Sequence, residues 1–279
     1  MPGILSVMGA ETDIQLLVQR TIPLPFITLM ITVGMFILND LVDADLDRAN
    51  SKNRPIPSGR VSKKQALSFI ILTNGAAVAM LILIATVAST ILVMPMIIIG
   101  ILYSMPKKIA FMNRFSLKNI SIAVFYMLCI MLGISASYGI DLAINNPVIP
   151  IHIMTVSGIM IFVGSIVNDL GDIKGDKAAG RRTIPIVLGG ENTITMLIIL
   201  LGSMPAISWI LYGAFAEHNT RSIITPIAVT IVASLALLRM TRIERVFEDM
   251  KLMREQHKKW FPLYMLLQLG NVAGSLLPL

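Results

Sequence analysis

Seven of the chain's 16 acidic residues lie in two short segments, and each segment directly follows a long uncharged run. Residues 39–47 and 168–176 share the pattern Asn-Asp-Leu-x-Asp-x-x-x-Asp. In each segment one asparagine and two aspartates are spaced four residues apart, so a continued helix would place their side chains on one face. These sets are Asn39, Asp43 and Asp47, and Asn168, Asp172 and Asp176. The sequence therefore predicts two acidic faces, one after each run.

Oxygen ligands without histidine or cysteine are typical of a site for a hard cation. Mg²⁺ in particular is held by a few carboxylates together with waters and substrate phosphates. Carboxylates at the C-terminal end of a helix also oppose the helix dipole, so a cation is needed to offset them. A diphosphate bound through Mg²⁺ between the two acidic faces is therefore the predicted ligand. The loops that follow both segments supply basic residues for the phosphate oxygens, including Arg54, Lys174, Arg181 and Arg182.

The elements that carry these segments are expected to lie in a membrane. Hydrophobic residues make up 55% of the 279 residues and charged residues only 14%, whereas about a quarter of the residues in a soluble domain are charged. A run of about 20 apolar residues can span a bilayer as a helix. Eight such runs are present, with turn-type residues between them. They are residues 21–38, 66–88, 91–105, 120–138, 148–167, 193–212, 223–238 and 261–279.

The basic residues give these spans an orientation. All but two of the 23 Lys and Arg residues lie in four islands, at 48–64, 107–118, 174–182 and 239–259. Two spans separate each island from the next, so all four islands fall on one face of the membrane. The positive-inside rule predicts that this face is cytoplasmic. Membrane topology thus accounts for the net charge of +7, and no nucleic-acid partner is expected.

The two acidic segments also indicate an internal repeat. Besides the shared aspartate pattern, the sequence Arg-x-Ile-Pro at residues 54–57 recurs at 182–185. We therefore expect a single transmembrane domain of two related halves, about 1–118 and 119–279. Both acidic segments follow a span that enters the same face, so the repeats have parallel topology and a site is expected at their interface.

These motifs resemble those of the UbiA-type intramembrane prenyltransferases. The matching segments are residues 39–47, 53–60, 168–176 and 180–185. A Tyr-Ser pair before a basic loop, at Tyr103 and Ser104, matches a further family feature, and Lys118 occupies the position of the family's diphosphate-binding lysine. The likeness extends through the chain from about residue 21 onward.

The resemblance implies an all-helical fold of nine spans around a central cavity, with cytoplasmic loops capping it. It also implies transfer of an isoprenyl group from an allylic diphosphate, with two Mg²⁺ ions bridging the diphosphate. The implied metal ligands are Asn39, Asp43, Asp47, Asp172 and Asp176. The implied catalytic residues are Asp43, Asp172, Asp176, Lys118 and Tyr103. The implied substrate-binding residues are Asn39, Arg54, Ser104, Asn168, Lys174 and Arg182.

Two further stretches carry expectations about the membrane. Residues 1–10 are too short to span it and lack the pattern of a secretory signal, so they look like the tail of a further helix, and the first of the nine spans is expected to be missing or truncated. Residues 243–259 form a charged, amphipathic stretch expected along the cytoplasmic interface. Trp260 is the expected headgroup anchor beside it.

The motif details are most similar to those of archaeal family members that make digeranylgeranylglyceryl phosphate for membrane lipids. This likeness implies a geranylgeranyl donor and geranylgeranylglyceryl phosphate as the acceptor. Quinone and haem prenyltransferases share much of the motif, so an aromatic acceptor stays open as an alternative. An ion-coupled transporter or divalent-cation channel is the alternative from another class, because repeats and intramembrane aspartates also occur there.

Overall fold

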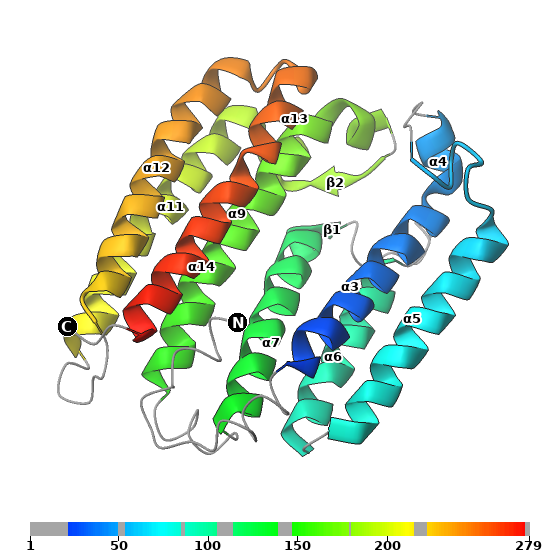
Figure 1. Cartoon of the computed structure of the whole chain (residues 1–279). Coiled ribbons are helices and arrows are strands. Elements are labelled where there is room, and N and C mark those ends of the chain that lie inside the picture. Colours follow the sequence, from blue (N-terminus) through cyan, green and yellow to red (C-terminus); the bar gives the residue numbers. More distant parts are fainter. Residues whose placement is uncertain are drawn as a thin grey trace.

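A computed structural model of the chain describes residues 22–49, 54–84, 87–104, 114–138, 147–178, 180–214 and 222–276. Its long apolar helices run side by side (Figure 1), and the eight predicted spans are confirmed as helices in the described residues. The helices are α3 (Pro23–Val42), α5 (Lys63–Ile84), α6 (Val87–Tyr103), α7 (Leu117–Tyr138), α9 (Val148–Ala178), α11 (Gly190–Ala214), α12 (Ile224–Val246) and α14 (Trp260–Leu276). Residues 1–21, where the tail of a further helix was predicted, lie outside the described residues.

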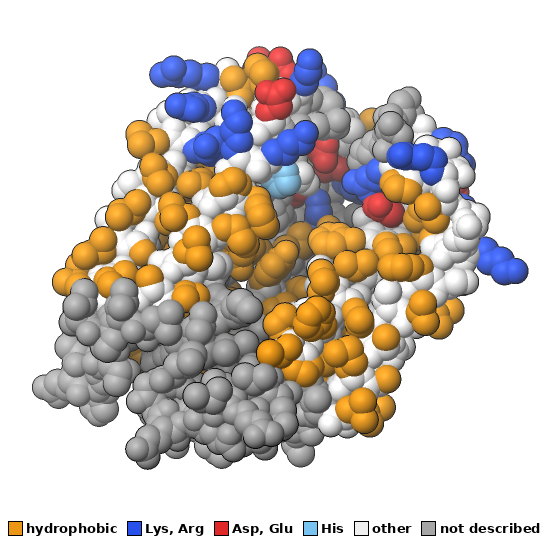
Figure 2. All heavy atoms as spheres, in the orientation of Figure 1, with side chains coloured by type: hydrophobic (Ala, Val, Ile, Leu, Met, Phe, Trp, Pro, Cys, Tyr) orange, Lys and Arg blue, Asp and Glu red, His pale blue; other side chains and the backbone are white. Residues whose placement is uncertain are grey.

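Six of these helices are long and apolar enough to cross a membrane by length and composition: α3, α5, α7, α9, α11 and α12. The other two, α6 and α14, have 17 residues each, and 17 residues of helix extend for about 25 Å. Hydrophobic side chains cover the sides of the bundle in Figure 2, whereas the acidic and basic side chains gather at one end. The structure therefore has the architecture of a multi-pass helical membrane protein.

Five short elements lie near this charged end: α4 (Ala44–Ala49), β1 (Arg114–Phe115), β2 (Arg182–Thr183), α10 (Ile184–Leu188) and α13 (Met250–Lys258). The two-residue strands β1 and β2 pair in parallel, with Arg114 opposite Arg182. The predicted all-helical fold is otherwise confirmed. This small bridge forms because the loop before α7 and the loop after α9 meet there.

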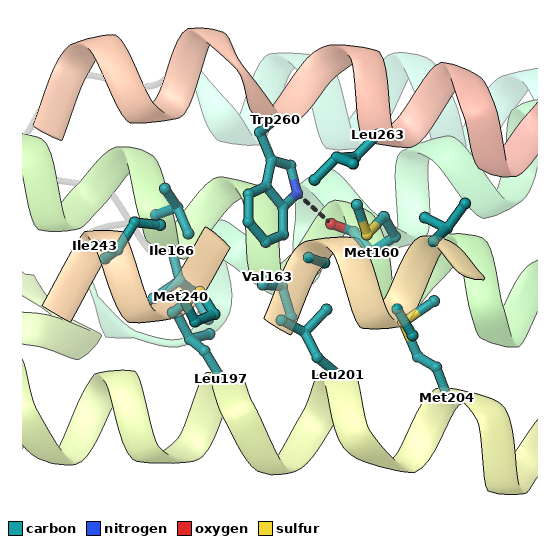
Figure 3. Close-up of a cluster of buried hydrophobic side chains, with 14 of the residues drawn as sticks. Met160, Val163, Ile166, Leu197, Leu201, Met204, Met240, Ile243, Trp260 and Leu263 are labelled. Carbon is teal, nitrogen blue, oxygen red and sulfur yellow. Dashed lines mark hydrogen bonds between the residues drawn. The ribbon is translucent and has the colours of Figure 1, made fainter. Parts of the chain in front are cut away.

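The helices form two groups, each with its own buried apolar cluster. One cluster is contributed by α3, α5, α6 and α7, for example Ile27, Met96 and Phe125. The other, larger cluster comes mainly from α9, α11, α12 and α14 (Figure 3). Helix α7 also packs along α9. The α7–α9 pair therefore joins the two groups and fixes the register between the charged ends of both.

Trp260 belongs to the second cluster, so the prediction of a headgroup anchor is wrong. Its side chain is buried with only 4% of its surface exposed, and Nε1 donates to the carbonyl of Met160 at 3.3 Å (Figure 3). Gly164 makes room for the indole, because a Cβ there would lie 2.5 Å from Cδ1 of the ring. The turn at Lys259 between α13 and α14 directs Trp260 onto α9 and away from the lipid.

Candidate active site

The first acidic segment is helical but not one continuous helix. Helix α3 ends at Val42 and α4 begins at Ala44, with Asp43 at the break. The amide of Asp43 still donates to the carbonyl of Asn39 at 2.9 Å, and the amide of Asp47 donates to that of Asp43 at 2.8 Å. The prediction of a continued helix is therefore wrong at Asp43, although the hydrogen bonds keep the four-residue spacing.

The second acidic segment is a continuous helix, as predicted. The 31 residues of α9 continue through Asn168, Asp172 and Asp176 to Ala178. About 20 residues suffice to span a bilayer, so the last turns of α9 extend past the membrane-spanning part. These turns carry the acidic residues toward the loops of the charged end.

Arg181 joins the two acidic segments. Its Nη2 lies 3.1 Å from Oδ2 of Asp43, and its Nη1 lies 3.2 Å from Oδ1 of Asp176. The two carboxylates, Asp43 and Asp176, are 133 residues apart in the sequence. The expected opposition of two acidic faces is therefore altered in one respect, because a guanidinium lies between them.

A tight turn positions Arg181 over the end of α9. Gly180 has a φ of +67°, a left-handed conformation that favours glycine. The amide of Gly180 donates to the carbonyl of Lys177 at 3.1 Å, and that of Arg181 donates to the carbonyl of Asp176 at 2.9 Å. This pair of bonds is the Schellman helix ending. Arg182 then enters the bridge with β1, so the backbone is held on both sides of Arg181.

A second arginine pairs with two other carboxylates of the first segment. Arg54 is ion-paired with Asp40 through Nη1, and the same nitrogen lies 3.0 Å from Oδ2 of Asp47. The side chain of Asp47 is only 2% exposed. A buried carboxylate of this kind needs a cationic partner, and the predicted substrate-binding residue Arg54 provides it.

Lys118 is paired with a residue that the helical-face argument left out. Its Nζ lies 2.5 Å from Oδ1 of Asp169, whose side chain is fully buried. Asn119 donates to Oδ2 of the same carboxylate and to Oγ of Ser165, each at 3.0 Å. This network connects the start of α7 to α9 and holds Lys118 beside the second acidic segment.

Helix α6 ends at Tyr103, and Ser104 follows it, near these groups. Tyr103 is close enough to Lys118, Asp169, Arg181 and Asp43 to interact with their charges. Ser104 is buried, and its hydroxyl donates to the carbonyl of Met35 on α3 at 3.3 Å. The Tyr-Ser pair therefore lies at the site, with the serine fixing α6 against α3.

Two predicted substrate-binding cations are not brought to the carboxylates. Lys174 and Arg182 are both exposed, and within the described ranges no ion pair with a carboxylate involves either. Arg181 takes the place predicted for Arg182, because the Schellman turn directs the first arginine of the pair inward. The basic loop after the second segment contains both arginines, but the repeated Arg-x-Ile-Pro sequence favours Arg182 over its neighbour.

Sequence reasoning also left out Asp40, Asp169 and His257. The Asn-Asp dipeptide is repeated, and in each copy the aspartate pairs with a base, Arg54 or Lys118. The repeated Asn-Asp dipeptide was therefore the sequence signal that could have indicated Asp40 and Asp169. His257 on α13 lies near Asp172 and Asp169, and burial lowers the pKa of His257 although both carboxylates act in the opposite direction.

The electrostatics of the site suit both a cation and an anion. Burial by itself lowers the pKa of Arg181, but Asp43 and Asp176 outweigh this effect and raise it, so the guanidinium stays charged. Oδ2 of Asp176 and Nε of Arg181 are buried, and neither has a hydrogen-bond partner among the described residues. A buried carboxylate oxygen suits a metal ion, and a buried N–H suits a phosphate oxygen.

The described residues contain no group of three or more His, Cys, Asp or Glu side chains placed to hold a metal ion. Instead, Arg54 is ion-paired with Asp40 and Asp47, and Arg181 is ion-paired with Asp43 and Asp176. Mg²⁺ does not require such a group, because it commonly keeps waters and uses only one or two carboxylates together with substrate phosphates. The donor set therefore fits a Mg²⁺–diphosphate complex better than a bare metal ion.

Figure 2 shows the surface hollowed between the two helix groups, with charged side chains at its rim and hydrophobic side chains on its walls. Such a hollow suits a ligand with a charged end and an apolar tail.

Comparison with known proteins agrees with this arrangement. Digeranylgeranylglyceryl phosphate synthase from Methanosphaera stadtmanae is 28% identical over 163 residues, which cover 58% of this chain and 56% of that protein. The aligned region thus spans about half the length of that relative. The enzyme of the same name from Sulfolobus acidocaldarius is 27% identical over 243 residues, 83% of this chain and 81% of that protein.

A solved structure shares the fold. The UbiA homolog from Archaeoglobus fulgidus, determined with GPP and Mg²⁺ bound, has a TM-score of 0.65 at 18% sequence identity, covering 99% of this chain and 93% of that chain. Residues 1–254 match the sequence profile of the UbiA prenyltransferase family, and this range contains both acidic segments. The chain therefore belongs to the UbiA prenyltransferase family.

Proposed function

We propose that this protein transfers a geranylgeranyl group from geranylgeranyl diphosphate to geranylgeranylglyceryl phosphate, with Mg²⁺, in archaeal membrane lipid synthesis. Membership of the UbiA family supports a prenyltransferase over the transporter and channel alternatives. The curated relatives named digeranylgeranylglyceryl phosphate synthase support this donor and acceptor.

One observation carries the proposal: Arg181 binds Asp43 of the first acidic segment and Asp176 of the second. Two segments that a single side chain can join are close enough to bind one diphosphate. The two proposed metal positions are Asn39 and Asp43 with Asp47, and Asp172 with Asp176. When bound there, Mg²⁺ would neutralise charge that develops on the diphosphate as the allylic C–O bond breaks.

The protein's own residues have three tasks in this reaction. Lys118, held by Asp169, and Arg54 bind phosphate oxygens and stabilise the leaving diphosphate. Asn168, Tyr103 and Ser104 line the site around the breaking bond. The apolar helices exclude water, which would otherwise capture the prenyl carbon as it gains cationic character. The acceptor hydroxyl then attacks this carbon because binding holds the two close together.

The charged end of the bundle is proposed to face the cytoplasm. Both acidic segments and the basic islands lie on the side that the positive-inside rule assigns to the cytoplasm. The basic loop 107–118 contains no acidic residue, which favours it as the binding site of the acceptor's phosphate. Residues 107–113 of this loop lie outside the described residues.

A product assay tests the proposal. The purified full chain in lipid nanodiscs is incubated with labelled geranylgeranyl diphosphate and with geranylgeranylglyceryl phosphate, 4-hydroxybenzoate or a naphthoate. We expect a lipid ether to form from the glycerol phosphate, only when Mg²⁺ is present. Prenylation of an aromatic ring without any lipid ether would contradict the proposed acceptor and favour a role in quinone synthesis.

A further inference from the structure

Arg181 is bonded to one carboxylate of each proposed metal position. Its two terminal nitrogens are 3.1 and 3.2 Å from Asp43 and Asp176. The guanidinium side chain is 21% exposed, and the two carboxylates are 17% and 8% exposed. A guanidinium and a metal ion cannot both lie within bonding distance of the same carboxylate oxygens. A metal ion that binds through the oxygens now bonded to Arg181 therefore displaces the arginine from at least one of the two carboxylates.

The surroundings of Arg181 favour such an exchange. The Schellman turn and the bridge between β1 and β2 fix its backbone, so only the side chain has to move. Oδ2 of Asp176 has no hydrogen-bond partner in the described part of the chain, and neither has Nε of Arg181. Among the described residues, Arg181 thus leaves one carboxylate oxygen and one of its own N–H groups without a hydrogen bond. A metal ion would use the remaining carboxylate oxygen, and a phosphate oxygen would accept from the remaining N–H.

We propose that Arg181 is an exchangeable internal counter-ion: without metal it neutralises and joins Asp43 and Asp176, and it gives up these carboxylates when Mg²⁺ and diphosphate bind together. This inference rests on the proposed function. When Mg²⁺ binds alone, it must displace an arginine that is bonded to two carboxylates. The displaced guanidinium then has no new partner. Mg²⁺ with a diphosphate offers the displaced guanidinium phosphate oxygens. Metal and diphosphate therefore bind cooperatively, and Arg181 is the origin of the coupling.

The test is a calorimetric titration of the purified full chain in detergent with MgCl₂, with and without inorganic pyrophosphate. In the unaltered protein, pyrophosphate should tighten Mg²⁺ binding by a factor on the order of ten. In Arg181→Gln, Mg²⁺ alone should bind about tenfold more tightly than in the unaltered protein, and pyrophosphate should add little. Unchanged or weaker binding of Mg²⁺ alone in Arg181→Gln would overturn the proposal.

Two further variants make the result specific. Lys177→Gln removes an exposed positive charge next to Asp176, so it should leave both affinities as they are. An equal gain in Lys177→Gln would mean that net charge alone is responsible, and it would overturn the counter-ion role. If Arg181→Gln does not fold, Arg181→Lys is the variant that tests the proposal. The single ammonium of lysine cannot bond to both carboxylates as the planar guanidinium does. Tighter binding of Mg²⁺ alone in Arg181→Lys supports the exchange, and unchanged binding overturns it.

The outcomes also separate this inference from the proposed function. Mg²⁺ that binds the unaltered protein and Arg181→Gln equally overturns only the counter-ion role, and prenyl transfer still stands. Failure of Mg²⁺ to bind either protein, even with pyrophosphate, overturns the metal site and both proposals with it.

Discussion

Asp43 and Asp45 are separated by one residue, yet their environments differ. The side chain of Asp43 is 17% exposed and paired with Arg181, whereas that of Asp45 is 75% exposed and paired with the surface residues Arg48 and Lys63. Exposed ion pairs contribute about 0–1 kcal/mol. The first residue is therefore placed to act in the site, and the second is placed to interact mainly with solvent.

This difference predicts different effects of two alanine substitutions. Asp43→Ala should lower kcat/KM for prenyl transfer by about 100-fold or more, because it removes a carboxylate of the proposed metal–diphosphate site. Asp45→Ala should change kcat/KM by no more than about twofold. Steady-state assays on both variants check this, with thermal unfolding in detergent to show that both fold. A larger loss in Asp45→Ala than in Asp43→Ala would contradict the site.

The pair between Lys118 and Asp169 makes a prediction about stability. Lys118→Met leaves a fully buried carboxylate without its cation, and removal of one partner of a buried pair lowers the free energy of unfolding by about 3 kcal/mol or more. Asp169→Asn in the same chain should restore part of this loss, since the buried charge is then gone. Denaturant unfolding of the two variants measures both changes. Equal stability of Lys118→Met and the unaltered protein would show that this pair does not stabilise the fold.

At the scale of elements, the C-terminal end of α9 positions Arg181. Gly180→Ala places a side chain at a φ of +67°, which lowers the free energy of unfolding by about 1–2 kcal/mol. Gly175 lies within α9, and a Cβ there would meet no atom within 4 Å. Gly175→Ala should therefore leave stability unchanged or raise it by about 0.5–1 kcal/mol. Thermal unfolding compares the two variants, and a greater loss in Gly175→Ala would exclude this turn.

Gly164 and Gly158 make a second matched pair on α9. A Cβ at Gly164 would lie 2.5 Å from Cδ1 of Trp260, and the ring is held by its bond to Met160. A Cβ at Gly158 would meet only the flexible end of Met127. We expect Gly164→Ala to lower the free energy of unfolding by about 1–3 kcal/mol and Gly158→Ala by less than about 1 kcal/mol.

The emission of Trp260, recorded in a Trp209→Phe chain, provides the second measurement for this pair. It should shift in Gly164→Ala and stay constant in Gly158→Ala. The same emission in both variants would contradict the packing of Trp260 on α9.

The uncharged runs were enough to predict all eight helices, because a membrane-spanning helix needs a long apolar segment. The ends of the helices were harder to predict from the sequence. Asp43 interrupts a pattern that reads as one helix, and α9 continues well past the uncharged run that ends at Val167. Trp260 lies at a boundary between polar and apolar sequence, where composition alone cannot distinguish a headgroup anchor from a core residue.

The site was predictable to the level of motifs but not of partners. Spacing predicted Asp43, Asp47, Asp172 and Asp176 as site residues, and the structure brings Asp43 and Asp176 together through Arg181. It could not show that Arg181 rather than Arg182 turns inward, since this depends on the conformation of Gly180. The pairing of Lys118 with Asp169 depends on how α7 packs along α9, which no local pattern records.

At the scale of the whole molecule, two helix groups with separate apolar clusters meet at a charged end. Among the described ion pairs, those of Arg181 with Asp43 and with Asp176 connect the two acidic segments. Each segment alone offers only one of the two proposed metal positions. The architecture therefore makes the binding of a metal and a diphosphate depend on both segments at once.

The binding of geranylgeranyl diphosphate tests this dependence most directly. Its affinity is measured for the unaltered protein, Asp43→Asn and Asp176→Asn, each in Mg²⁺ and in excess EDTA. We predict tight binding only for the unaltered protein in Mg²⁺, with a loss on the order of 100-fold after chelation or after either substitution. Affinity that is undiminished in EDTA, or that survives the loss of either aspartate, would contradict a single metal–diphosphate site built from both segments.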